Sequence, residues 1–94
     1  MHETGLVRDL IRKVEALVRE NGAARAKQVQ VSIGALAHFS PEHFREHFVE
    51  ESIGSLCEGA QLCIRESQDM SDPSAQDILL DSLEVEMAEV KQVN

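Results

Sequence analysis

The stretch VQVSIGALAHFSPEHFREHF, residues 29–48, contains the signals for a strand followed by a helix. Over residues 27–34, apolar side chains alternate with polar ones, which is the period-two pattern of a strand buried on one face. Ser40, Pro41 and Glu42 then combine a helix-capping side chain, a first-turn proline and an early acidic residue. The stretch therefore predicts a half-buried strand and, after a short connection, a helix that ends near residue 52 or 53.

Upstream of this stretch, residues 6–21 have the i, i+3, i+4, i+7 apolar spacing of an amphipathic helix. The apolar positions are Leu6, Val7, Leu10, Ile11, Val14, Leu17 and Val18. Thr4 is the expected N-cap, and Gly22 stands where a left-handed residue commonly ends a helix. We therefore predict a first helix from Leu6 to Asn21 with its charged face in solvent.

Downstream, two further segments have the periodicity of strands. Residues 60–66 alternate between apolar and polar side chains, and residues 78–87 do so after a change of phase. That change falls between Leu80 and Leu83 and predicts a β-bulge. The segment between the two strands, SQDMSDPSAQ at residues 67–76, is polar and contains a proline, so we predict a loop there.

Composition and element order together predict one small folded domain. Of the 94 residues, 43% are hydrophobic and 28% are charged, the balance of a soluble globular protein. The order helix, strand, helix, strand, strand predicts a two-layer α+β domain over residues 1–94, with two amphipathic helices packed on one face of a three-stranded mixed sheet.

Charge and the lack of long apolar runs exclude several classes of partner. Seventeen Asp and Glu against nine Lys and Arg give a net charge of −8, which disfavours binding to nucleic acid. No apolar run approaches the roughly 20 residues that span a membrane, and no export signal is recognisable. We therefore expect a cytoplasmic protein without a membrane partner, in which Cys57 and Cys63 are free thiols.

The first three residues, Met1, His2 and Glu3, are a candidate metal-ligand set. The α-amine, the amide nitrogen of residue 2 and the imidazole of His2 can close adjacent chelate rings on one ion, and Glu3 can add its amide nitrogen or its carboxylate. We expect Met1 to be retained, because His2 is too large for methionine aminopeptidase. Deprotonated amide ligands favour Ni(II) and Cu(II) over Zn(II), and affinity should fall at low pH. The alternative is a mobile terminus that starts Met-His by chance.

Four segments together resemble the HypA/HybF family of nickel-incorporation accessory proteins of NiFe-hydrogenases. They are MHE at residues 1–3 before an amphipathic helix, the strand, IGAL and SPE order within residues 29–48, EGAQLCIRE at 58–66 and SLEVE at 82–86. The resemblance implies a nickel chaperone whose N-terminal tripeptide binds Ni(II). With a GTPase accessory protein, it would pass the ion to a hydrogenase large-subunit precursor or a urease. The two-helix, three-stranded nickel domain of the family agrees with the fold predicted from periodicity.

The sequence departs from this family between its last two strands. Family members carry a zinc lobe with two Cys-x-x-Cys pairs at that point, where this chain has only the loop 67–76. Cys57 and Cys63 lie outside the insertion point and in no such pair, whereas a structural zinc site takes four Cys or His ligands. We therefore expect Ni(II) to be bound but no structural zinc.

Other histidines and one sheet face could also take part in binding. His43 and His47 lie one helical turn apart, and a solvated helix face is favoured over a metal site for them. His38, in the connection before the second helix, is a further candidate ligand. We expect Ile78 and Leu80 to add apolar area to the sheet face away from the helices, which would suit a homodimer.

Two hypotheses about function follow from the sequence. The first is a nickel-binding metallochaperone-like accessory protein that uses Met1, His2 and Glu3 for the maturation of a NiFe-hydrogenase or a urease. The second is a metal-free adaptor that keeps the family fold and partner surface. We expect no enzyme, because the sequence shows no general acid and base pair, nucleophile triad, phosphate-binding glycine loop or nucleotide fingerprint.

Overall fold

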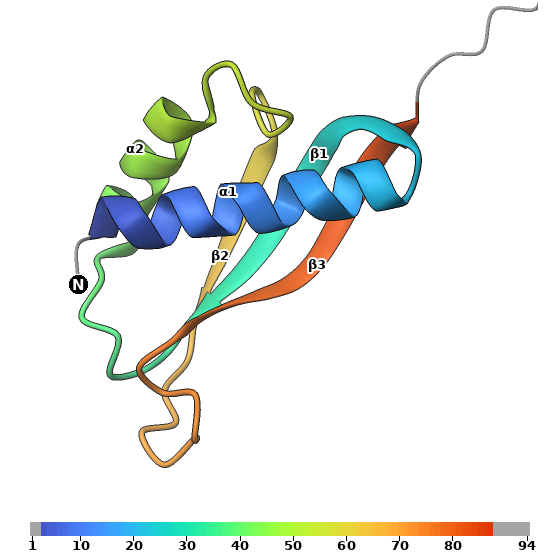
Figure 1. Cartoon of the computed structure of the whole chain (residues 1–94). Coiled ribbons are helices and arrows are strands. Elements are labelled where there is room, and N and C mark those ends of the chain that lie inside the picture. Colours follow the sequence, from blue (N-terminus) through green and yellow to red (C-terminus); the bar gives the residue numbers. More distant parts are fainter. Residues whose placement is uncertain (1–2, 88–94) are drawn as a thin grey trace, which may run out of the picture.

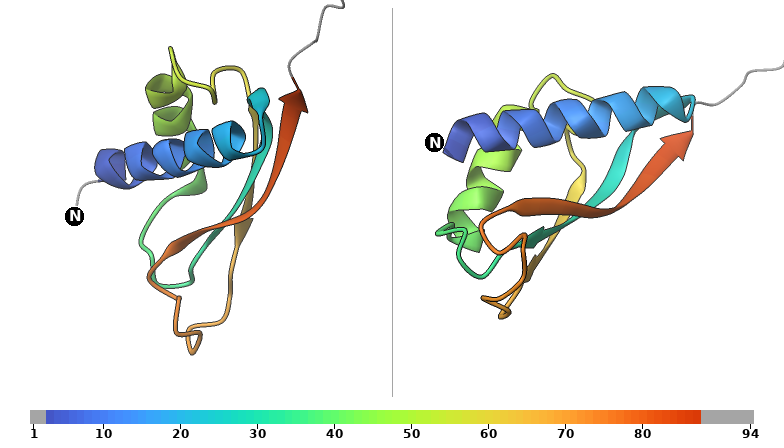
Figure 2. Two further views of the ribbon diagram at one scale, coloured as in Figure 1. Left: turned by 45° about the vertical axis from the view of Figure 1, so that its right-hand side comes forward. Right: turned by 60° about the horizontal axis from the view of Figure 1, so that its bottom comes forward.

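The structure is a computed structural model that describes residues 3–87 as two helices on one face of a three-stranded sheet (Figures 1 and 2). The elements are α1 (Glu3–Glu20), β1 (Ala23–Ile33), α2 (Pro41–Ser52), β2 (Gln61–Glu66) and β3 (Ile78–Met87). The predicted α+β class and element order are confirmed. Within the described part of the chain, no helix is both long and apolar enough to cross a membrane.

The sheet is mixed, with β1 in the centre and the order β2-β1-β3. β1 runs parallel to β2, from which it is separated by the crossover through α2, and antiparallel to β3. Gln30 pairs with Ser82 and Val31 with Leu80, so Asp81 has no partner on β1. This extra residue is the predicted bulge, and it changes which face the side chains of β3 point to.

The core lies between the sheet and the two helices. α1 crosses the sheet and α2 packs beside it near one end (Figure 2). Apart from Cys57, in the connection between α2 and β2, the larger fully buried side chains come from both helices and from β1, and they are Val7, Val14, Val18, Val29, Val31, Phe44 and Phe48. Burial of each of these side chains stabilises the fold by about 1.5–3 kcal/mol before entropy is counted. The apolar side of the helix over residues 6–21 is therefore buried, as its amphipathic pattern predicts.

The start of α1 and the start of β1 differ from the predictions. α1 begins at Glu3, so Thr4 lies inside the first turn, and its prediction as N-cap is wrong. Extending a formed helix by a few residues costs little, and the first N–H groups need no acceptor within the helix. Gly22 has the predicted left-handed backbone, with φ 64°, and turns the chain directly into β1. β1 therefore begins at Ala23, four residues before the predicted start at Lys27.

α2 begins and ends where the sequence predicts. The side chain of Ser40 accepts a hydrogen bond from the backbone N–H of His43 at 3.5 Å, and Pro41 is the first helical residue. Arg45, one turn into the helix, donates from Nη1 to the backbone carbonyl of Leu62 at 2.7 Å. This bond occupies a carbonyl of β2, which is an edge strand of the sheet.

The connection between β2 and β3 is the predicted loop, and it is bound to the segment that follows β1. The backbone N–H of Gly34 donates to the carbonyl of Asp77 at 2.9 Å, and that of Leu36 donates to Ala75 at 2.7 Å. A Cβ on Gly34 would lie 2.8 Å from the carbonyl oxygen of Ser74 and closer still to that of Ala75. Only glycine therefore fits at this crossing.

The sheet face away from the helices is polar. Gln28 donates its amide to the sulfur of Cys63 at 3.2 Å, and other cross-strand pairs extend along the same face. Ile78 and Leu80 instead pack against the core, so their predicted position on the outer face is wrong. They pair with Ile33 and Val31 of β1, which point toward the helices. The prediction of a homodimer therefore loses the apolar surface on which it rested.

Candidate metal site

Of the predicted ligands Met1, His2 and Glu3, the structure describes only the backbone of Glu3, at the N-terminal end of α1. Met1 and His2 fall outside the described residues, as does the side chain of Glu3. The backbone of Glu3 is the first residue of the helix. The first N–H groups of an α-helix have no acceptor within the helix, so the amide nitrogen of Glu3 is not engaged in a helical hydrogen bond.

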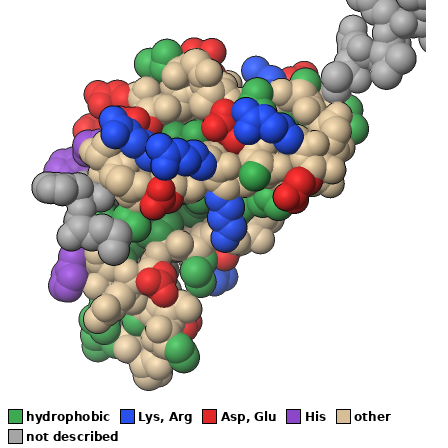
Figure 3. All heavy atoms as spheres, in the orientation of Figure 1, with side chains coloured by type: hydrophobic (Ala, Val, Ile, Leu, Met, Phe, Trp, Pro, Cys, Tyr) green, Lys and Arg blue, Asp and Glu red, His purple; other side chains and the backbone are tan. Residues whose placement is uncertain are grey.

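A hollow of about 380 Å³ lies beside this first part of α1. It brings together α1, the connection between β1 and α2, and the end of the β2–β3 loop. Its lining residues are Leu6, Leu36, Ala37, His38, Phe39 and Gln76. In Figure 3, histidine side chains lie at the end of the molecule where α1 begins, on a surface with hydrophobic areas. Sequence reasoning did not identify this hollow, because its walls are distant in the chain and carry no common motif.

His38 has an unusual backbone at the rim of this hollow. Its φ is 58°, the one positive value at a residue other than glycine among residues 3–87. The left-handed conformation costs such a residue about 1–2 kcal/mol. His38 is exposed, and within the described part of the chain its side chain has no hydrogen bond or ion pair. The imidazole of His38 is therefore exposed and makes no polar interaction with the described residues.

His43 and His47 lie on α2 at the predicted spacing of one helical turn. His43 is exposed and His47 is partly exposed, as expected for a solvated helix face. No group of three or more His, Cys, Asp or Glu side chains placed to hold a metal ion occurs within residues 3–87. A metal site built from these two histidines and a nearby carboxylate therefore has no support from the geometry.

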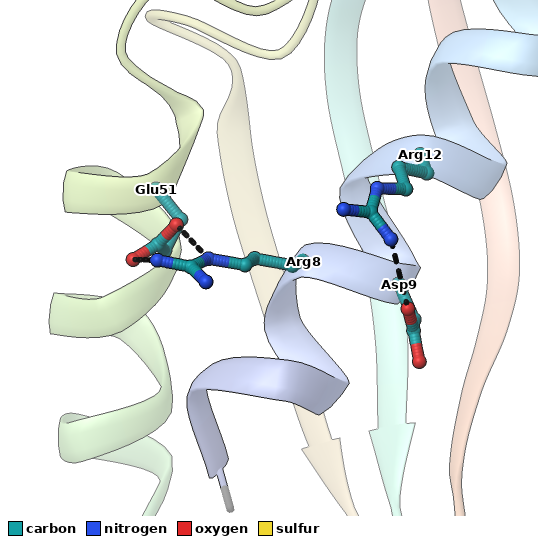
Figure 4. Close-up of polar contacts among 4 residues, drawn as sticks. All are labelled: Arg8, Asp9, Arg12 and Glu51. Atoms are coloured by element: carbon teal, nitrogen blue, oxygen red, sulfur yellow. Dashed lines mark hydrogen bonds and ion pairs between the residues drawn. The ribbon is translucent and has the colours of Figure 1, made fainter.

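An ion pair fixes the start of α1 against α2 (Figure 4). Arg8 Nε donates to Glu51 Oε2 at 2.7 Å, and Arg8 Nη2 donates to Glu51 Oε1 at 3.4 Å. The hydrogen bond from Arg8 is the main reason that the pKa of Glu51 lies below its usual value of 4.5. The second pair in the figure, Asp9 with Arg12 at 3.6 Å, is more exposed and contributes little to stability.

The two cysteines are free thiols in different environments. Cys57 is completely buried, and burial, followed by the charge of Glu15, raises its pKa to about 11. Cys63 lies on the outer sheet face beside Gln28. Neither cysteine lines the hollow next to α1. The expectation that the chain binds no structural zinc stays a prediction, which metal analysis of the purified protein would test.

Comparison with known families identifies one match that covers most of the chain. The family model described as "Hydrogenase/urease nickel incorporation, metallochaperone, hypA" matches residues 1–71. The hydrogenase maturation factor HypA of Chlorobium limicola is 39% identical over 66 residues, which are 70% of this chain and 57% of that protein. HypA of Moorella thermoacetica is also 39% identical over 66 residues, 70% of this chain and 58% of that protein. The chain thus spans little more than half the length of these relatives.

Solved structures show the same fold at low sequence identity. The solution structure of the Ni metallochaperone HypA from Helicobacter pylori superposes with a TM-score of 0.79 and 22% identity, over 94% of this chain and 100% of that chain. A second solution structure, of a HypA protein, has a TM-score of 0.71 and 24% identity, over 90% of this chain and 96% of that chain. At these identities the likeness establishes the fold.

Proposed function

Because the chain belongs to the HypA family, we propose that it is a nickel-binding metallochaperone-like accessory protein that holds Ni(II) through Met1, His2 and Glu3. The observation that carries the proposal is the family match, which begins at residue 1 and so includes the Met-His-Glu tripeptide. The ion is a cargo that the protein binds and releases. The role is that of an accessory protein and involves no catalysis.

The start of α1 at Glu3 suits amide coordination. Binding through a deprotonated amide removes an N–H donor, and inside a helix this would break a hydrogen bond. At residue 3 there is no such bond to lose, because the first N–H groups of a helix have no acceptor in it. The chelate can therefore form without unfolding the first turn of α1.

The charge of the complex also fits the helix terminus. The N-terminal end of a helix carries about half a positive charge, which disfavours a bare cation. Two deprotonated amides cancel the charge of Ni(II), and the carboxylate of Glu3 would make the complex negative. The net charge of −8 on the chain adds a general attraction for cations. The amide-bound ion is thus better suited to this position than an ion held by neutral donors.

Nickel affinity should depend steeply on pH. The α-amine, with a reference pKa of about 7.7 to 8.0, and the imidazole, at about 6.5, must both lose protons before they bind. Each coordinated amide also releases a proton. Affinity is therefore expected to fall as the pH drops through this range, so that acidification releases the ion.

Delivery requires partners that this chain would contact during transfer. From the family we propose a GTPase accessory protein and, as recipient, a hydrogenase large-subunit precursor or a urease. Cu(II) binds nitrogen ligands at least as tightly as Ni(II), so the choice of nickel would come from supply and from these partners. The cytoplasm is the proposed location.

Titration with Ni(II) by calorimetry and visible absorption tests the proposal. The protein needs its native N-terminus, and the variants are His2→Ala, a form with one extra residue before Met1, and His43→Ala as the matched control. We expect one equivalent of Ni(II) to bind, with a d–d band typical of nitrogen ligation. Both N-terminal variants should lose this binding while His43→Ala keeps it. No binding in the native protein would leave the metal-free adaptor as the better hypothesis, and unchanged binding in His2→Ala would overturn the N-terminal site.

A further inference from the structure

We propose that Asn21 is a site of spontaneous deamidation, at which the chain converts its own asparagine to aspartate and isoaspartate with water as the co-reactant. Asn21 and Gly22 form the whole connection between α1, which ends at Glu20, and β1, which begins at Ala23. Asn21 is also the one asparagine within residues 3–87. The inference concerns the junction of these two elements and does not rest on the proposed nickel site.

The reaction requires a backbone nitrogen that can reach the side-chain amide of the preceding asparagine. The nitrogen of Gly22, after losing its proton, attacks Cγ of Asn21, and the new N–Cγ bond closes a five-membered succinimide ring. The Cγ–Nδ2 bond breaks and ammonia leaves. Water then opens the ring at either carbonyl, which gives aspartate or, where the chain now runs through the side-chain carbon, isoaspartate. Glycine favours this attack because no Cβ lies beside its nitrogen.

The structure leaves the reacting groups sterically accessible. Asn21 and Gly22 are both exposed, and apart from the chain neighbours of Gly22 nothing lies within 4 Å of the position that a Cβ would take there. Gly22 has φ 64°, and glycine adopts both positive and negative φ readily, so the nitrogen can turn toward the side chain at little steric cost. Water can reach the ring from the same open side.

Hydrogen bonds at the end of α1 slow the reaction without preventing it. Asn21 Nδ2 donates to the carbonyl of Leu17 at 2.7 Å, and the backbone N–H of Gly22 donates to the carbonyl of Arg19 at 3.0 Å. The attack requires both bonds to break, so it proceeds from molecules in which the last turn of α1 has opened. Helix ends open at small cost, and two bonds of ordinary strength reduce the open fraction to about one in thirty. The folded protein should therefore deamidate about thirtyfold more slowly than the unfolded chain.

Deamidation should loosen the junction of α1 and β1. The carbonyl of Leu17 accepts from both the backbone N–H and Nδ2 of Asn21, and an aspartate there lacks the second donor. The new carboxylate also stands at the negative end of the helix dipole. Isoaspartate lengthens the backbone by one carbon just before Ala23, which pairs with Met87. We expect the Tm to fall by about 4–8 °C for the aspartate form and further for the isoaspartate form.

The experiment incubates the full chain at neutral and mildly alkaline pH, folded in buffer and unfolded in guanidinium chloride. Mass spectrometry of the intact protein and of its proteolytic peptides measures the rate and the position of conversion. Asn21→Gln is the matched control, because its side chain keeps the amide donor but would have to close a six-membered ring, which forms slowly. Asn21→Asp reproduces one product, and thermal unfolding followed by circular dichroism compares it with the native protein.

Conversion at Asn21 in the folded protein, about thirtyfold slower than in the unfolded chain, faster at the higher pH and absent in Asn21→Gln, would support the proposal. If the folded protein stays intact over a period about a hundredfold longer than the unfolded chain needs, the end of α1 protects Asn21 and the proposal is wrong. Equal conversion in Asn21→Gln would place the reaction at another residue. If the deamidated protein and Asn21→Asp both unfold at the native temperature, the predicted loosening of the junction is refuted.

Discussion

Replacement of Gly34 by alanine should destabilise the fold more than any other glycine-to-alanine change at a described position. The added Cβ would lie 2.8 Å from the carbonyl oxygen of Ser74 and closer to that of Ala75, both backbone atoms that cannot rotate away. Gly34 is not among the glycines with positive φ, so the effect comes from the lack of space for a Cβ and not from backbone strain.

The size of the effect follows from what must move. To admit the methyl group, the β2–β3 loop has to separate from β1, which weakens the hydrogen bonds from Gly34 to Asp77 at 2.9 Å and from Leu36 to Ala75 at 2.7 Å. Each contributes about 1 kcal/mol, and overpacking alone typically costs 1–3 kcal/mol. We expect a loss of about 2–3 kcal/mol, equivalent to a fall in Tm of roughly 10 to 20 °C for a domain of this size.

Two other glycines provide matched controls for thermal unfolding followed by circular dichroism. Gly5 lies in α1 with nothing within 4 Å of its hypothetical Cβ, so Gly5→Ala should stabilise by about 0.5 kcal/mol. Gly22 is equally open but has φ 64°, so Gly22→Ala should cost about 1 kcal/mol of strain. If Gly34→Ala unfolds at the same temperature as Gly22→Ala or higher, the close contact at Gly34 does not restrict the side chain there.

Three further predictions concern groups with unusual environments. At pH 8, a thiol reagent should modify Cys63 well before Cys57, whose buried thiol has a pKa of about 11; equal rates would contradict the assigned burial. Glu51→Gln should lower the urea midpoint of unfolding at pH 7, because the ionised carboxylate of Glu51 stabilises the fold. The difference in midpoint between the variant and the native protein should vanish as the pH falls through the lowered pKa of Glu51. Arg45→Met should lower the free energy of unfolding by about 1 kcal/mol, because it removes the hydrogen bond to the carbonyl of Leu62. Unfolding curves that coincide with those of the native protein would show that solvent replaces this hydrogen bond.

Local signals in the sequence were sufficient for most of the secondary structure. Ser40, Pro41 and Gly22 act within one turn of their own position, and each has the predicted role. Thr4 shows the limit of this approach, because the residue preferences at a cap are worth about 1 kcal/mol and can be outweighed. The early start of β1 was missed for a related reason, since Ala23 to Ala26 do not alternate and are ordered by pairing with β3.

The sequence of β3 alone does not determine which side chains of the strand point toward the helices and which point away. Three consecutive apolar residues, Ile78 to Leu80, are compatible with either face, and the bulge at Asp81 separates them from the alternating part of the strand. Their orientation is set by pairing with β1, so that Ile78 and Leu80 enter the core and Leu79 stays exposed. A register is a relation between two strands, and neither strand specifies it alone.

The candidate site also has one part that can be predicted from local sequence and one part that depends on the folded structure. The chelating capacity of Met1, His2 and Glu3 follows from covalent structure, because their donor atoms are separated by a few bonds, and it can be predicted without coordinates. The nearness of His38 to the first turn of α1 depends on β1 and on the loop that crosses Gly34. Disturbing that crossing should therefore reshape the hollow beside α1 while leaving nickel binding through the tripeptide intact. Gly34→Ala, where it remains folded, should therefore bind Ni(II) as the native protein does, because the donor atoms of the tripeptide are fixed by covalent structure and not by this loop.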